Sequence, residues 1–115
     1  MFKESVDARL SDWANLRKKI EIAKDPYRVL IEFWKQAPLI VHNHKVDPYD
    51  FKSWPTPWEI LAENKYDDFT LALMMAYSLK LTERFRKDSV KIKTMVDYSK
   101  TKLYNLVFVN EDKVL

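Results

Sequence analysis

The chain has 115 residues, a formal net charge of +3 and a hydrophobic content of 47%, which suits one folded domain and argues against disorder. It contains no Cys, which excludes disulfides, thiolate metal sites and thiol nucleophiles. It also contains no Gly, which excludes Walker and Rossmann phosphate loops, and turns are expected to use Asn, Asp and Pro instead. No apolar run reaches the ~18 residues of a membrane span and no signal-peptide core is visible, so the expected location is the cytoplasm, without a membrane partner.

Two amphipathic helices are predicted in the N-terminal part of the domain, residues 1–37. Large apolar residues recur at helical spacing from Val6 to Ile20, with charged residues between them. Asp25 and Pro26 then have the order of an N-cap followed by Pro at the first helical position. The second helix is expected to continue until Pro38.

The middle of the chain is predicted to be mostly irregular. Residues 39–41 form a short apolar run that suits a strand, and the Pro-rich segment 42–55 predicts a loop. Thr56 and Glu59 have the spacing of a capping box, in which each side chain accepts a hydrogen bond from the backbone of the other. A short helix is therefore expected from residue 57 to about residue 63.

A helix buried in the domain centre is predicted next. Three of residues 69–81 are polar, and a helix that is apolar nearly all round belongs in the core. Its N-terminus is expected near Tyr66 to Asp68, because carboxylates suit the positive end of the helix dipole. Asp67 and Asp68 suggest an acid–base pair. The alternative is that one caps the helix and the other is solvated, since neighbouring helical positions point about 100° apart.

A β-hairpin is predicted towards the end of the chain. Residues 90–96 alternate between apolar and polar, and residues 103–109 are apolar apart from Asn105, so the second strand is expected to be the more buried. Residues 113–115 resemble the first residues of a third strand. The fold class is therefore α+β, with N-terminal helices and a buried central helix packed on a small antiparallel sheet.

Two segments resemble motifs of the transglutaminase-like superfamily, which has a papain-like core. The family pattern W-x-T-P-x-E-x-L is matched by Trp54, Thr56, Pro57, Glu59 and Leu61. The end of a second pattern, G-D-C-E-D-[YF]-A, is matched by Asp67, Asp68 and Phe69. The resemblance covers residues 54–109 and implies a core over 54–115 that is truncated in its third strand. The chain also resembles small proteins of tailed phages, which implies the host cytoplasm or the virion.

The resemblance implies a domain that has lost its catalytic residues. In the family, a Cys at the mouth of the buried helix attacks an amide carbonyl, and a His on the adjacent strand accepts its proton. Here Tyr66 stands at the Cys position, and Tyr104, or Asn105 if the register shifts by one, stands at the His position. The implied role is binding or structural, with no cofactor and an unknown protein or peptide partner. A relict cleft, unless the two Tyr rings fill it, would be lined by Tyr66, Tyr104, Asp67 and Asn105.

A basic segment gives the first alternative function. Between residues 80 and 102, eight Lys or Arg residues accompany three acidic residues, and Tyr98 is available for stacking. This composition suits a nucleic-acid-binding accessory protein, although pairing with Glu83, Asp88 and the acidic middle of the chain explains it without a nucleic acid. The candidate phosphate-binding residues are Arg84, Arg86, Lys87, Lys91 and Lys93.

A metal-dependent hydrolase is the third candidate. His42 and His44 are two residues apart, and Asp47 and Asp50 follow, a set of ligands that zinc or iron sites use. A plain loop explains the same residues, so the first interpretation includes no metal. The oligomeric state is left open by the sequence.

Overall fold

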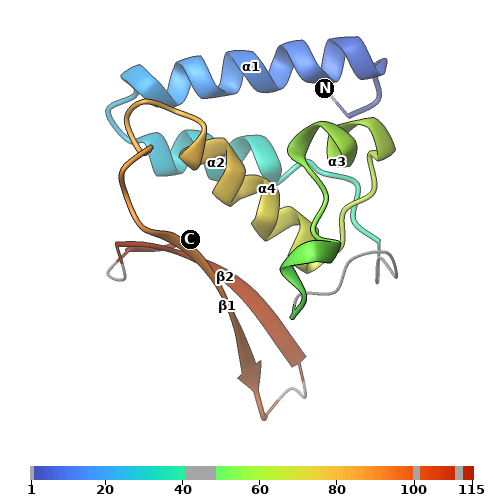
Figure 1. Cartoon of the computed structure of the whole chain (residues 1–115), viewed down its shortest axis with the longest axis vertical. Helices are drawn as coiled ribbons and strands as arrows, with labels where there is room; N and C mark the ends of the chain where they lie inside the picture. Colours follow the sequence, from blue (N-terminus) through green and yellow to red (C-terminus); the bar gives the residue numbers. More distant parts are fainter. Residues whose placement is uncertain (1, 41–48, 100–101, 111–112) are drawn as a thin grey trace.

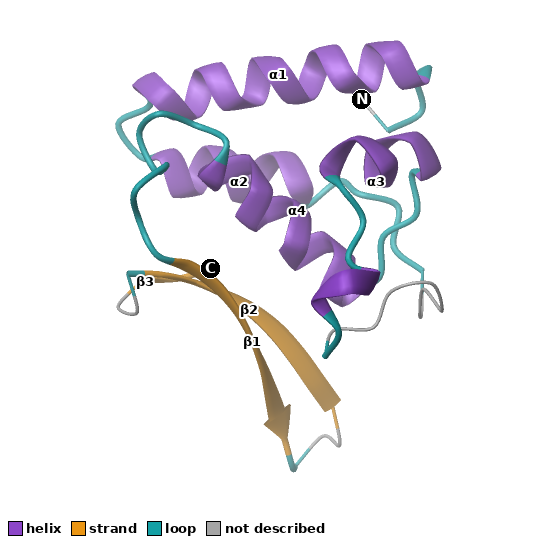
Figure 2. Ribbon diagram, in the orientation of Figure 1, coloured by secondary structure: helices purple, strands orange, loops and turns teal. Residues whose placement is uncertain are grey.

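The computed structural model describes residues 2–40, 49–99, 102–110 and 113–115 (Figure 1). Within these ranges the helices pack together above one face of a curved antiparallel sheet (Figure 2), which confirms the α+β class. The elements in chain order are α1 (Val6–Ile22), α2 (Pro26–Trp34), the 3-10 turn η1 (Phe51–Ser53), α3 (Pro57–Glu63), α4 (Asp68–Lys80), β1 (Val90–Asp97), β2 (Lys102–Val109) and β3 (Lys113–Val114). No helix in the described part of the chain is both long and apolar enough to cross a membrane.

The predicted helix caps form as expected. The Asp25 carboxylate accepts a hydrogen bond from the Arg28 N–H at 3.1 Å, with Pro26 at the first position of α2. Thr56 Oγ1 accepts from the Glu59 N–H, and the Glu59 carboxylate accepts from the Thr56 N–H, both at 3.3 Å. The capping box at the start of α3 is therefore confirmed.

The segment after α2 differs from the prediction in two details. The helix ends at Trp34 rather than just before Pro38, where the Ala37 N–H donates to the Trp34 carbonyl in a tighter turn. The strand predicted over residues 39–41 is reduced to an isolated bridge between Leu39 and Tyr66, and residue 41 lies outside the described residues.

Two Asn residues take the backbone conformation for which Gly is usually needed. Asn64 follows α3 with φ of 57°, and Asn110 follows β2 with φ of 53°. Asn64 also donates from its side chain to the Phe2 carbonyl at 2.8 Å, and Asn110 accepts at its side chain from the Ser89 N–H at 3.0 Å. The expected replacement of Gly by Asn in tight turns is thus confirmed, and both side chains fasten these turns to distant segments.

One hydroxyl in α4 joins three helices at the centre of the core. Trp13 of α1 and Trp34 of α2 both donate their indole N–H to Ser78 Oγ, at 2.9 and 3.2 Å. Ser78 Oγ in turn donates to the Met74 carbonyl at 2.7 Å. All three side chains are at most 1% exposed, so both buried indole groups are satisfied by one polar atom.

A buried guanidinium on α1 bonds to the C-terminal end of α3. Arg9 of α1 is 8% exposed and donates to the Leu61 and Ala62 carbonyls at 2.9 and 3.2 Å, and also to the Glu4 carbonyl. Leu61 and Ala62 belong to the last turn of α3, whose carbonyls have no partner within their own helix. Arg9 therefore serves as a tertiary cap for α3.

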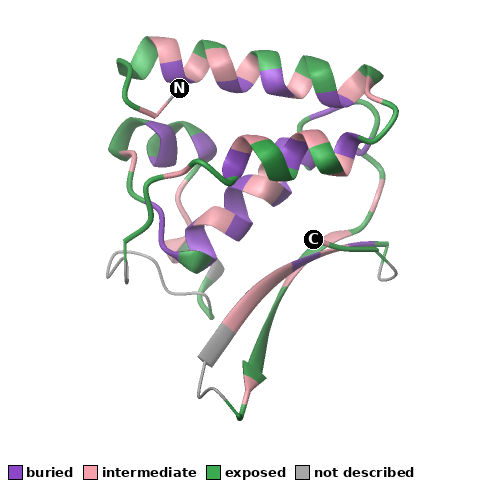
Figure 3. Ribbon diagram, turned by 180° about the vertical axis from the view of Figure 1, so that it is seen from behind, coloured by how far each residue is buried: buried purple, intermediate pink, exposed green. Residues whose placement is uncertain are grey.

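The sheet has the order β1-β2-β3 and packs one face against α4. Val90 pairs with Val109 and Ile92 pairs with Val107, and both β2 residues are 1% exposed. Figure 3 shows β1 mostly exposed, whereas β2 is buried or half-buried where it is described. The prediction that the second strand is the more buried one is confirmed, and the predicted third strand forms as β3.

The Ser78 contacts predict a large stability effect. Ser78→Ala should lower the free energy of unfolding by about 2–6 kcal/mol, because two indole N–H groups would be left buried without a partner at about 1–3 kcal/mol each. Urea unfolding followed by Trp fluorescence measures this change. Thr70→Val is the matched control, since Thr70 lies in the same helix, is 1% exposed, and its hydroxyl has no hydrogen-bond partner among the described residues. Equal losses in the two variants would contradict the role given to Ser78.

Candidate functional site

The two acids at the mouth of α4 have different partners. Asp67 is 6% exposed and caps the helix by accepting from the Thr70 N–H at 2.7 Å. Asp68 accepts at one oxygen from both the backbone N–H and the side-chain amide of Asn105, each at 2.9 Å. The cap is confirmed, and Asp68 is exposed, as expected for the second acid, while its carboxylate also ties α4 to β2. The two carboxylates therefore do not form an acid–base pair.

Asn105, rather than Tyr104, is the β2 residue that reaches this mouth. Its amide oxygen also accepts from Thr94 Oγ1 of β1 at 2.8 Å, so its side chain is fixed between α4 and the neighbouring strand. Side chains alternate between the two faces of a strand. The Tyr104 side chain therefore lies on the face of the sheet that points away from α4. Of the two alternatives for the family's His position, Tyr104 and Asn105, it is Asn105 that lies at the mouth of α4.

Tyr66 is enclosed in an aromatic cluster. Its side chain is 0% exposed, and its ring centroid lies 5.6 Å from that of Phe2 and 5.7 Å from that of Trp34. Its hydroxyl has no hydrogen-bond partner among the described residues. Burial raises the pKa of Tyr66 to about 12, against the opposing effect of the Arg9 charge. Tyr66 is thus a neutral phenol with no surface open to a ligand in this conformation.

Tyr66→Phe keeps the buried ring and removes the hydroxyl, so it separates the effect of ring packing on stability from that of hydroxyl ionisation. At pH 8 the variant should be as stable as the wild type or about 1 kcal/mol more stable, because it removes an unpaired buried hydroxyl. Tyr66 titrates at 10.0 when unfolded and at about 12 when folded, so the wild type should lose stability as the pH rises from 10 towards 12, at up to about 1.4 kcal/mol per pH unit.

Urea unfolding of both proteins at pH 8 and pH 11 measures this difference. The pKa of Tyr77 is also raised, by burial and then by the Glu59 charge, but Tyr77 is present in both proteins and its effect cancels. The same loss of stability between the two pH values in wild type and variant would contradict the assignment.

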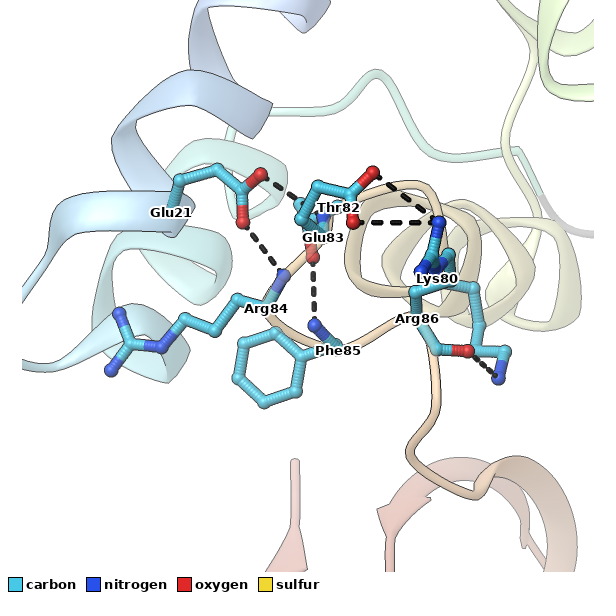
Figure 4. Close-up of polar contacts among 7 residues, drawn as sticks. All are labelled: Glu21, Lys80, Thr82, Glu83, Arg84, Phe85 and Arg86. Carbon is cyan, nitrogen blue, oxygen red and sulfur yellow. Dashed lines mark hydrogen bonds and ion pairs between the residues drawn. The ribbon is translucent and has the colours of Figure 1, made fainter.

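Several of the basic candidates are used within the fold (Figure 4). Arg84 donates from its guanidinium to the Ile20 and Ala23 carbonyls at the end of α1, at 3.0 and 2.6 Å. The Glu21 carboxylate accepts from the Glu83 and Arg84 N–H groups at 3.0 and 2.8 Å. These contacts fasten the turn between α4 and β1 to the C-terminal end of α1.

Lys80, the last residue of α4, and Arg86, in the same turn as Arg84, are also bonded within the fold. Lys80 Nζ donates to the Arg86 and Asp88 carbonyls at 2.9 and 2.7 Å, and Arg86 pairs with Glu83 at 3.4 Å. Lys87, Lys91 and Lys93 are exposed. The basic segment is therefore partly a structural network. Its exposed part lies along β1 and just before that strand.

Arg84→Ala should destabilise the fold by about 1.5–3 kcal/mol, the range for hydrogen bonds to charged groups, because two carbonyls at the end of α1 lose their donor. Lys87→Ala removes one positive charge from the same turn and should change the stability by less than about 0.5 kcal/mol. Thermal or urea unfolding of both variants measures the difference. Similar stabilities for the two variants would show that Arg84 has no structural role.

An apolar groove of about 430 Å³ runs between α4 and β1. On the helix side it is lined by one stripe at helical spacing, and on the other side by the first half of β1. Tyr77 is held in place by a hydrogen bond from its hydroxyl to the Pro55 carbonyl at 3.0 Å. The lining residues are Trp54, Leu73, Ala76, Tyr77, Lys80, Val90, Lys91, Ile92 and Lys93.

Along the edge of β1 beside this groove, every second residue points its backbone N–H and C=O groups away from the sheet. Ser89 accepts from the Asn110 N–H at 2.7 Å, so this pair and every second pair along the hairpin exchange ladder hydrogen bonds. The N–H and C=O groups of the alternate β1 residues then point away from β2; these residues are Val90, Ile92, Thr94 and Val96. Within the described ranges no strand lies beyond β1.

The third candidate site lies outside the described residues, since His42 and His44 fall in the segment 41–48. Among the residues that the structure does describe, no group of three or more His, Asp or Glu side chains is arranged to hold a metal ion. Comparisons with protein-family models, curated proteins and solved structures find no match to this chain.

The groove is not predicted by the sequence. The helical stripe 73, 76, 77 and 80 and the apolar alternation of β1 are both visible in the sequence. What the sequence did not reveal is the strand order, which leaves β1 at an edge, and the packing of that stripe beside the edge.

Proposed function

We propose that this chain is a non-catalytic, transglutaminase-like domain of phage or phage-derived origin that binds an extended peptide segment of a partner protein. The binding site is the groove between α4 and β1. The observation that carries the proposal is an apolar groove of about 430 Å³ running beside a strand edge whose backbone groups face outward. An edge of this kind accepts a peptide as an additional strand, and pockets beside it select the side chains.

In strand addition, the backbone edge of β1 and the apolar lining of the groove contribute differently to peptide binding. The outward N–H and C=O groups of Val90, Ile92 and Thr94 would form ladder hydrogen bonds with the peptide backbone. These bonds replace bonds to water, so they fix register more than they add affinity. Affinity would come from apolar peptide side chains buried against Leu73 and Ala76, at about 25 cal/mol per Å² of apolar surface.

The mouth of α4 supports a non-catalytic role. At the positions where the resemblance places a nucleophile and a base, the chain has an enclosed phenol, Tyr66, and an amide, Asn105. The Asn105 amide is already bonded to Asp68 and to Thr94. The order of the elements and the contact between the helix mouth and β2 support the family resemblance.

Ala76→Phe tests the groove directly. Ala76 lies on its helix side and is 8% exposed, so a phenyl ring there would fill the space that a peptide side chain needs. An array of random peptides probed with the purified wild-type protein should select extended apolar segments, and Ala76→Phe should lose that binding. Ala14→Phe is the matched control, because Ala14 is a half-buried Ala on α1, outside the groove.

Circular dichroism and thermal unfolding establish that both Phe variants remain folded. Retained binding by a folded Ala76→Phe protein would contradict the proposed site. An array that selects no peptide would contradict the function itself.

A further inference from the structure

The direction of side chains on β1 determines what a peptide in the groove must present. A residue that pairs with Val90 or Ile92 has its side chain on the same face of the sheet, which is the face towards α4. That side chain would enter a space bounded by Leu73, Ala76 and the Tyr77 ring. A polar group placed there would lose its contact with water, so apolar residues of moderate size fit these positions.

The intervening peptide residues meet a different surface. They pair with Lys91 and Lys93, whose side chains lie on the opposite face of the sheet and are exposed. The Lys93 ammonium lies 4.6 Å from the centroid of the Phe108 ring, which holds the charge over that face of the sheet. Lys80, on the helix side of the groove, donates from its ammonium to the Arg86 and Asp88 carbonyls, and the groove lining includes no acidic residue.

We infer that the partner segment alternates apolar and acidic residues, with the apolar residues facing α4 and the acidic residues beside Lys91 and Lys93; this inference rests on the peptide-binding function proposed above. Opposite charges across a strand pair stabilise it, and like charges destabilise it. The two lysines thus protect the edge against basic or self-pairing strands while admitting an acidic one.

Three peptides with the same apolar residues test the charge selection. They contain Val-Glu-Val-Glu-Val, Val-Thr-Val-Thr-Val or Val-Lys-Val-Lys-Val, with identical Gly-Ser flanks and a fluorophore, and their Kd values are measured by fluorescence anisotropy. The acidic peptide should bind roughly 10-fold more tightly than the neutral one, from two favourable charge pairs, and the basic peptide most weakly. The difference should narrow in ~1 M salt.

Charge reversal on β1 should reverse the order of the peptides. The double variant Lys91→Glu/Lys93→Glu should bind the basic peptide more tightly than the acidic one. Lys18→Glu/Lys19→Glu makes the same change in net charge on exposed residues of α1 and should retain the wild-type order. Ala76→Phe should weaken binding of the acidic peptide and of the neutral one alike.

The outcomes separate the inference from the proposed function. Equal affinity for the acidic and neutral peptides, with both lost in Ala76→Phe, would overturn the charge selection and leave peptide binding in place. Failure of all three peptides to bind would overturn both. Acidic-peptide binding that survives Ala76→Phe, or that a single-stranded DNA oligonucleotide displaces with equal potency, would show general attraction of anions and overturn the inference. Sedimentation showing a dimer that Lys91→Glu/Lys93→Glu disrupts, with no peptide bound, would assign the edge to a second copy and also overturn it.

Discussion

The hydrogen bonds to Ser78 orient α4, the helix against which both the other helices and the sheet pack. α4 is apolar nearly all round and lies between the helical layer and the sheet, so it needs a feature that fixes its rotation. The two indole donors of Trp13 and Trp34 provide it, because both must point at one buried oxygen. With that rotation fixed, Asp68 faces the sheet at one end of α4, and the stripe containing Leu73, Ala76 and Tyr77 faces β1.

Two further contacts set the sheet against this helix. Asp68 holds β2 through Asn105. The turn before β1 is held against α1 by two contacts of Arg84, whose guanidinium donates to the Ile20 carbonyl and whose backbone N–H donates to the Glu21 carboxylate. Both contacts lie at ends of α4 or just beyond it, and the groove lies between them. The two contacts therefore hold the sheet beyond either end of the groove, whose own walls are mainly apolar.

The sequence predicted the features that depend on local chemistry. The capping box of Thr56 and Glu59, the Asp67 cap and the Asn residues at positive φ follow from residue type and spacing over a few positions. The structural role of Arg84 could not be predicted, because the sequence shows its charge and not the α1 carbonyls beside it. The groove also could not be predicted, because it depends on strand order and on which side of α4 faces the strand edge.

Amide hydrogen exchange of β1 can show whether a peptide adds to the edge of this strand. In the free protein the outward N–H groups of Ile92 and Thr94 should exchange rapidly, because they lie at the open edge of the sheet. When a peptide that alternates Val and Glu is bound, these two amides should become protected, and the amides of α1 should keep their exchange rates. Saturating binding that leaves Ile92 and Thr94 unprotected would contradict strand addition at this edge.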